Sequence, residues 1–143
     1  MKVAVNPFCG GEIDTGALEK VCVEVLRYEE ARRDILLSVT AVDEDEMRDL
    51  NRRFMKREGS TDVIAFPMGE ESEEGYLLGD VIICPEVIMR HRDEYRVDEG
   101  RELEYVAAHG VLHLLGYEDG DAVASASMDL RQRKILHIEG ERE

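Results

Sequence analysis

Two histidines four residues apart are the residues of this sequence best suited to chemistry. His109 and His113 lie in an otherwise apolar segment that ends at Gly116. On an α-helix, residues i and i+4 lie on one face about one turn apart, so both imidazoles can bind a single metal ion. The alternative is a pair of core histidines hydrogen-bonded to the backbone. The spacing, the glycine that can end the helix and the acidic residues after it favour a metal site.

The residue after His109 argues against one class of metalloenzyme. Zincin proteases carry a glutamate directly after the first histidine of the pair, where it acts as general base. This chain has Gly110 at that position. We therefore expect no protease mechanism that depends on such a glutamate.

The helix that must position the histidines is apolar nearly all round, which predicts that it is buried. Its apolar residues are Leu103, Val106, Ala107, Ala108, Val111, Leu112, Leu114 and Leu115. Gly116 can adopt a left-handed cap, so the helix is expected to end there. Residues 117–119 then turn back towards the histidine face, where a third ligand would complete the site.

Composition indicates one globular domain over residues 1–143. The chain is 43% hydrophobic and 36% charged, lacks tryptophan, and has only 6% aromatic residues, which predicts an aliphatic core. No apolar run is long enough to cross a membrane, and the N-terminal apolar stretch is too short for a signal peptide, so we expect a cytoplasmic protein. Cys9, Cys22 and Cys84 are odd in number and scattered, unlike a disulfide framework or a cysteine zinc site.

A net charge of −15 repels phosphate backbones unless basic residues are concentrated locally, which argues against non-specific nucleic-acid binding. We expect neither DNA nor a membrane as a partner. The acidic run 70–74 is expected to be a solvated loop. The densest basic stretch is 52–57, and by itself it is typical of a solvated helix face.

Periodicity and turn signals predict four strands, at residues 2–6, 35–42, 61–66 and 76–84. Pro67 is expected to stop the third strand, and Gly79-Asp80 to break or bulge the fourth. This order of elements predicts an α+β fold, a mixed four-stranded sheet with helices packed on it.

Five helices are predicted around these strands. The first has its apolar face from Ile13 to Leu26 and is capped by Asp14 or Thr15, and the second starts with a capping box of Asp43 and Glu46 and runs to about Gly59. The third runs from Pro85 to about Tyr95, and the histidine helix follows. The last begins at Asp121 and presents one face made of Ala124, Met128, Arg131, Ile135 and Ile138.

Three stretches of this chain resemble the YbeY family of metal-dependent endoribonucleases and ribosomal RNA maturation factors. They are Leu50-Asn51 with residues 61–67, residues 77–84, and residues 109–117. Their order and spacing span most of the chain after residue 40. The resemblance implies a single hydrolase domain with one zinc ion, held by two histidines of the helix and a third in the turn after Gly-Tyr.

Two positions depart from the family pattern. Asp119 stands where the third histidine is expected; a carboxylate can still bind zinc, with Glu118 and Asp121 as nearby substitutes. The alternative is that Asp119 and Asp121 only cap the last helix. Met55 stands where the family has an arginine that acts on the RNA phosphate. The alternative is that Met55 only packs against the core.

The resemblance places the substrate cleft beside the third strand. Neighbouring cations can replace the missing arginine only if they reach the cleft, and on a helix residues one or two positions away point elsewhere. Turn capping is the alternative for the two strand-edge residues. The candidate substrate-binding residues are Arg53, Lys56, Arg57, Thr61 and Asp62.

We therefore expect a metal-dependent endoribonuclease that acts in ribosomal RNA processing, with ribosomal RNA or a ribosomal subunit as its partner. Zinc is the expected ion, and other divalent metals are compatible with an acidic ligand. The sequence identifies no catalytic side chain, and His91 and His137 are expected at the surface or on a helix face. One alternative is a non-catalytic ribosome-assembly factor with a structural or vestigial metal site, which Met55 and the acidity favour. Another is a hydrolase of a small substrate.

Overall fold

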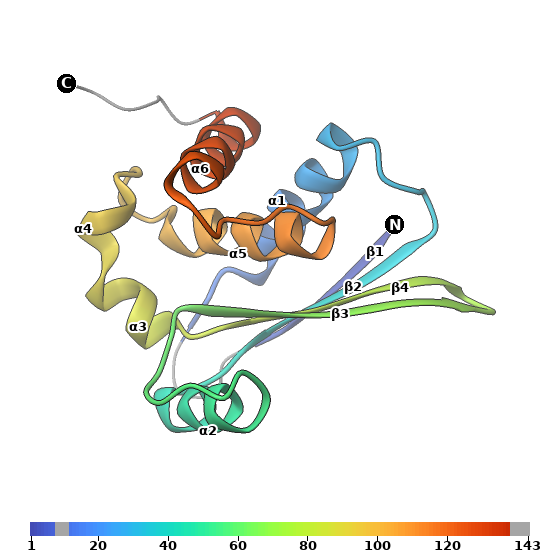
Figure 1. The fold of residues 1–143 in the computed structure, drawn as a ribbon. Helices are drawn as coiled ribbons and strands as arrows, with labels where there is room; N and C mark the ends of the chain where they lie inside the picture. Colours follow the sequence, from blue (N-terminus) through green and yellow to red (C-terminus); the bar gives the residue numbers. More distant parts are fainter. Residues whose placement is uncertain (8–11, 138–143) are drawn as a thin grey trace.

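The computed structural model describes residues 1–7 and 12–137 (Figure 1). Within these residues the sheet consists of β1 (Lys2–Asn6), β2 (Ile35–Ala41), β3 (Val63–Ser72) and β4 (Gly75–Ile83), in the order β1-β2-β4-β3. The first three strands of that order are parallel, and β3 is antiparallel to β4. The predicted mixed four-stranded α+β fold is confirmed.

The helices cover both faces of the sheet. They are α1 (Thr15–Tyr28), α2 (Glu44–Phe54), α3 (Pro85–Arg90), α4 (Arg92–Tyr95), α5 (Glu102–Leu114) and α6 (Ala122–Leu136). In Figure 1, α1, α5 and α6 lie on one face and α2 on the other. The larger core lies between the sheet and α1, α5 and α6, and a smaller one packs under α2 around Met47 and Ile64.

Helix α5 is the central helix of the larger core, packed against α1, α6, β3 and β4. Its buried residues include Val106, Val111 and Leu112, as expected from its apolar sequence. At Gly110 an added Cβ would lie 2.6 Å from Cγ1 of Val81 in β4. The helix therefore runs so close to the sheet that only glycine fits there.

Helix α5 ends in the predicted manner. Gly116 has φ 106°, a left-handed conformation that favours glycine. The Gly116 N–H donates to the His113 carbonyl at 3.0 Å, and the Tyr117 N–H donates to the Leu112 carbonyl at 3.1 Å. This pair of bonds is a Schellman motif, which reverses the chain and brings the following turn back over the histidine face.

The prediction that α2 extends to Gly59 is wrong. The helix ends at Phe54, and Lys56 has φ 58°, which turns the chain. Asn51 then holds the following loop, because its carbonyl accepts the Arg57 N–H at 3.2 Å and its side-chain amide donates to the Gly59 carbonyl at 3.0 Å. Residues 55–59 are therefore a loop anchored to the last turn of α2.

The expected end of the third strand at Pro67 is also wrong. Strand β3 continues to Ser72 after a register shift between Pro67 and Glu70. Proline is tolerated because β3 is an edge strand, where one side of the backbone needs no ladder partner. The acidic run 70–74 is therefore the end of a projecting β3–β4 hairpin rather than a loop (Figure 1).

Among the remaining elements, one differs from its prediction. The helix expected over residues 85–95 is divided at His91 into α3 and α4, and α4 has no buried residue to continue the packing. Of the break or bulge predicted at Gly79-Asp80, the structure has the bulge: β4 continues through Gly79, and its register against β2 shifts between Leu36 and Leu37. Helix α6 buries Met128 and Ile135 as expected, whereas Ile138 lies outside the described residues.

The aspartates predicted to cap helices do so. Asp14, Asp43 and Asp121 each accept a backbone N–H three residues ahead, at 2.9, 2.8 and 2.8 Å. Cys22 and Cys84 are free and buried, and Cys9 lies outside the described residues. Among the helices of residues 1–7 and 12–137, none has the length and apolarity needed to cross a membrane.

Candidate metal centre

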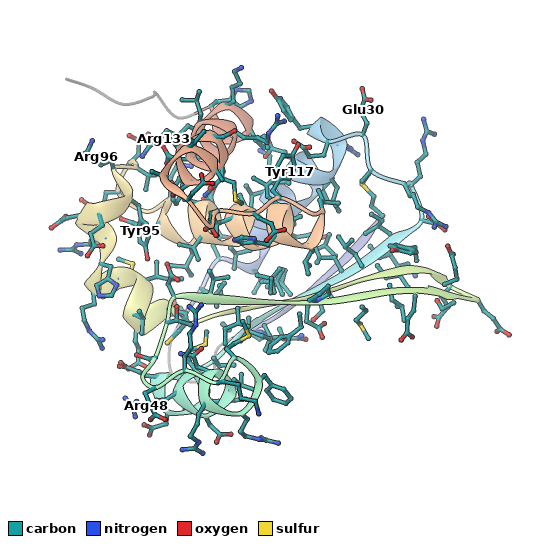
Figure 2. The ribbon with its side chains drawn as sticks, viewed as in Figure 1. Glu30, Arg48, Tyr95, Arg96, Tyr117 and Arg133 are labelled. Atoms are coloured by element: carbon teal, nitrogen blue, oxygen red, sulfur yellow. The ribbon has the colours of Figure 1, made fainter. Side chains whose placement is uncertain are left out.

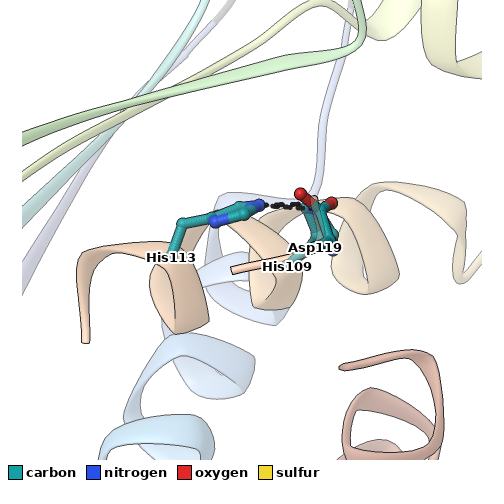
Figure 3. Close-up of side chains that lie close together, drawn as sticks. All are labelled: His109, His113 and Asp119. Carbon is teal, nitrogen blue, oxygen red and sulfur yellow. Dashed lines mark hydrogen bonds and ion pairs between the residues drawn. The ribbon is translucent and has the colours of Figure 1, made fainter. Parts of the chain in front are cut away.

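His109 and His113 of α5 meet Asp119 of the turn that follows (Figure 3). The two histidine Nε2 atoms lie 3.0 Å apart, and Oδ2 of Asp119 lies 3.1 Å from Nε2 of His109 and 3.4 Å from Nε2 of His113. A tetrahedral zinc ion with bonds of about 2.0–2.1 Å holds its ligands roughly 3.3 Å apart. The three atoms therefore have the spacing that one small cation requires.

Hydrogen bonds fix which nitrogen of each ring faces this point. Nδ1 of His113 lies 2.9 Å from the Tyr117 carbonyl, and Nδ1 of His109 lies 3.0 Å from Oε1 of Gln132. Both partners are acceptors, so in the neutral rings both Nδ1 atoms carry the proton and both Nε2 atoms present lone pairs. With the Asp119 carboxylate, three electron-pair donors converge, which is the arrangement of a metal site.

The two neighbouring acids are not part of this group. Asp121 caps α6 through the Ala124 N–H, and Glu118 is exposed and lines the cleft. Among the residues that the structure describes, only His109, His113 and Asp119 form a group of three or more potential metal ligands. The cap alternative therefore describes Asp121, whereas the Asp119 side chain faces the histidines.

The turn that carries Asp119 is tied to two helices. The Tyr117 hydroxyl donates to Oε1 of Glu29 at 2.7 Å, and Arg131 of α6 donates to Oε2 of Glu29 at 2.9 Å. The Arg131 guanidinium also lies 4.9 Å from the centre of the Tyr117 ring, whose position Figure 2 shows. Donation to the Glu29 carboxylate raises the pKa of Tyr117, so the hydroxyl remains a donor. These contacts restrict the turn next to the candidate ligand Asp119.

The three side chains lie in an open cleft of about 530 Å³ between α5, the edge strand β3 and the loop after α2. Of the candidate substrate residues, Arg57 and Asp62 line this cleft. Met55 also lines it and is 42% exposed, so the alternative that it packs in the core is wrong. Arg57 reaches the cleft because α2 ends at Phe54 and helical spacing no longer applies.

The other candidate substrate residues are not among the residues that line the cleft. Arg53 is exposed on α2 and pairs with Asp49 at 3.2 Å, and Lys56 is exposed in the loop. Thr61 donates to Asp62 at 3.4 Å. The structure therefore does not bring Arg53, Lys56 and Thr61 into the lining of the cleft.

A second, smaller pocket of about 330 Å³ adjoins the metal centre and shares His109 and Asp119 with the cleft. It contains residues that the sequence did not reveal: Tyr95, Tyr105, Ser125, Asp129 and Gln132. Tyr95 donates to Asp62 at 3.0 Å, and Tyr105 donates to Asp129. Burial raises the pKa of both tyrosines, so they remain neutral donors near pH 7. The sequence signal that could have found Gln132 is its helical spacing from Met128 and Ile135, which places it on the buried face of α6.

A helix-borne histidine pair with a carboxylate from the next turn, beside the edge strand of a mixed sheet, defines an α+β protein with an open site that could hold a metal ion. The family model Endoribonuclease YbeY matches residues 11–139. An Endoribonuclease YbeY of Salinispora tropica is 34% identical over 95% of this chain and 94% of its own length, and one of Streptomyces griseus is 38% identical over 95% and 88%. The chain belongs to the YbeY endoribonuclease family.

A solved structure agrees with this assignment. TM1509 from Thermotoga maritima is 26% identical, with a TM-score of 0.61 over 95% of this chain and 87% of that protein. The resemblance inferred from the three sequence stretches is confirmed.

Proposed function

We propose that this protein is a metal-dependent endoribonuclease that acts on ribosomal RNA in the cytoplasm. The observation that carries the proposal is the convergence of Nε2 of His109, Nε2 of His113 and Oδ2 of Asp119 in an open cleft, in a chain of this family. These three residues would hold one zinc ion. When bound, the ion supplies Lewis acidity, which lowers the pKa of a water molecule and stabilises negative charge on phosphoryl oxygens.

The other residues of the cleft position the substrate. Arg57 supplies positive charge at the cleft, which attracts a phosphate in a chain of net charge −15. Asp62, held by the Tyr95 hydroxyl, presents a fixed carboxylate between the two pockets. Three protein ligands leave a position for water or substrate, as in catalytic zinc sites. The carboxylate ligand also makes manganese or iron more acceptable than three imidazoles would.

The alternatives receive less support. A closed structural zinc site needs a fourth protein ligand, and Asp121, one of the two nearby acids, is engaged as the cap of α6. The relatives are named endoribonucleases, which favours RNA over a small substrate and cleavage over assembly alone. Ribosomal RNA, free or within a ribosomal subunit, is the substrate that we propose.

The direct test is metal removal. We expect purified protein to contain about one equivalent of zinc by elemental analysis, and stripping with a chelator to abolish cleavage of a ribosomal RNA fragment. Adding back zinc should restore cleavage, whereas Asp119→Ala should bind the ion more weakly. RNA cleavage that persists after complete metal removal would contradict the proposal.

Replacing Met55 by arginine is expected to tighten RNA binding several-fold at low salt, because Met55 lines the cleft beside Arg57. One added phosphate contact steepens the dependence of log affinity on log salt by roughly 0.7–0.9. The measurement is fluorescence anisotropy of a labelled RNA with metal-free protein across a salt series. Met68→Arg is the matched control, because Met68 is 48% exposed on the hairpin and does not line the cleft. Equal effects of both substitutions would place Met55 outside the RNA site.

A further inference from the structure

Gln132 of α6 is a polar side chain in the core. It is only 1% exposed and lies between buried Met128 and Ile135 on the helix. Burial of an amide is costly unless its hydrogen-bonding groups have partners. Both ends of this amide have one: Nε2 donates to the backbone carbonyl of Tyr105 at 3.0 Å, and Oε1 lies 3.0 Å from Nδ1 of His109.

The Tyr105 carbonyl determines how the amide is oriented. A carbonyl only accepts, so the nitrogen of Gln132 must face Tyr105 and the oxygen must face His109. Rotating the amide by 180° would bring two oxygens within 3.0 Å of each other at Tyr105. Because Oε1 only accepts, Nδ1 of His109 must donate, and in the neutral ring the lone pair of Nε2 then faces His113 and Asp119.

We propose that Gln132 is a positioning residue of the metal centre, which holds His109 in the tautomer and ring orientation that bind the ion. It acts through His109 and touches neither the ion nor the substrate. Its anchor is the backbone of α5 one turn before His109, so the acceptor is fixed relative to the ring that it orients. That His109 is a metal ligand rests on the function proposed above, whereas the tautomer of its ring does not.

Two substitutions separate positioning from a purely structural role. Gln132→Leu removes both hydrogen bonds, whereas Gln132→Glu keeps an acceptor for His109 and loses the donor to Tyr105. We expect zinc affinity, measured by calorimetry with a competing chelator, to fall about 10–100-fold in Gln132→Leu and to stay within about threefold of wild type in Gln132→Glu. If both variants lose affinity equally, the Tyr105 bond matters rather than the contact to His109, and the proposal is overturned.

The tautomer can be measured in the metal-free protein, including wild type. Long-range 1H–15N NMR spectra at a pH where the rings are neutral should show His109 of the wild type protonated at Nδ1. In Gln132→Leu the population should shift towards protonation at Nε2, while His113, whose partner is the Tyr117 carbonyl, should not change. A wild-type His109 protonated at Nε2 would overturn the proposal, even if the leucine variant did not fold.

The two readouts also separate this proposal from the proposed function. If wild type binds no zinc but His109 has the expected tautomer that depends on Gln132, the metal centre fails and the positioning of His109 by Gln132 stands. If wild type binds zinc and Gln132→Leu binds it with the same affinity, the metal centre stands and the positioning role fails.

Discussion

Replacing His113 by alanine is expected to abolish stoichiometric zinc binding and RNA cleavage while the protein remains folded. The substitution removes one of three convergent donors. His109 and Asp119 remain, with Nε2 and Oδ2 3.1 Å apart, and two ligands are too few to hold the ion. Loss of a direct ligand should exceed the roughly 10–100-fold effect of losing an outer-shell partner. Elemental analysis and an RNA cleavage assay with added zinc measure both effects.

The fold should tolerate this change because the His113 side chain is 28% exposed and points into the cleft rather than into the core. The urea midpoint of the metal-free protein is therefore expected to stay close to that of wild type. His91→Ala is the control, since His91 is exposed between α3 and α4, away from the cleft. A His113→Ala protein that still contains one equivalent of zinc would refute the assigned site.

Replacing Gly110 by alanine is expected to destabilise the fold and weaken the metal centre together. Alanine gains about 1 kcal/mol over glycine in helix propensity. Against this gain, its Cβ would lie 2.6 Å from Cγ1 of Val81 and 3.2 Å from Cγ2 of Val63. Val81 is fully buried and β-branched, so it cannot turn away, and such overpacking costs about 1–3 kcal/mol. The destabilisation from the clash should exceed the stabilisation from the higher helix propensity of alanine.

Because α5 carries both histidines, relief of the clash by moving the helix would also displace them from Asp119. Urea denaturation and zinc titration of Gly110→Ala measure the two effects. The matched control is Gly16→Ala in α1, where the nearest atom to the new Cβ is at an ordinary 3.5 Å and a gain of up to about 1 kcal/mol is expected. If Gly110→Ala is stabilised to the same extent as Gly16→Ala, the close approach of α5 to β4 is not a constraint.

Local sequence determined the parts of this protein that depend on near neighbours in the chain. The i,i+4 spacing puts His109 and His113 on one helix face, and Gly116 alone supplies the left-handed residue that ends α5. Alternating and helical apolar periods predicted four strands and the α+β class, because burial of one face imposes those periods. The resemblance, and not the spacing, singled out Asp119.

Tertiary structure decided which distant side chains meet the histidines. Gln132 is polar on an apolar helix face, and only the packing of α6 on α5 shows that it accepts from His109. Arg57 reaches the cleft because α2 ends before it, at left-handed Lys56 and the contacts of Asn51. A continued helix would have pointed the Arg57 side chain in another direction. Pro67 continues a strand because β3 lies at the edge of the sheet. The positions of Gln132 and Pro67 depend on contacts between elements that no local pattern encodes.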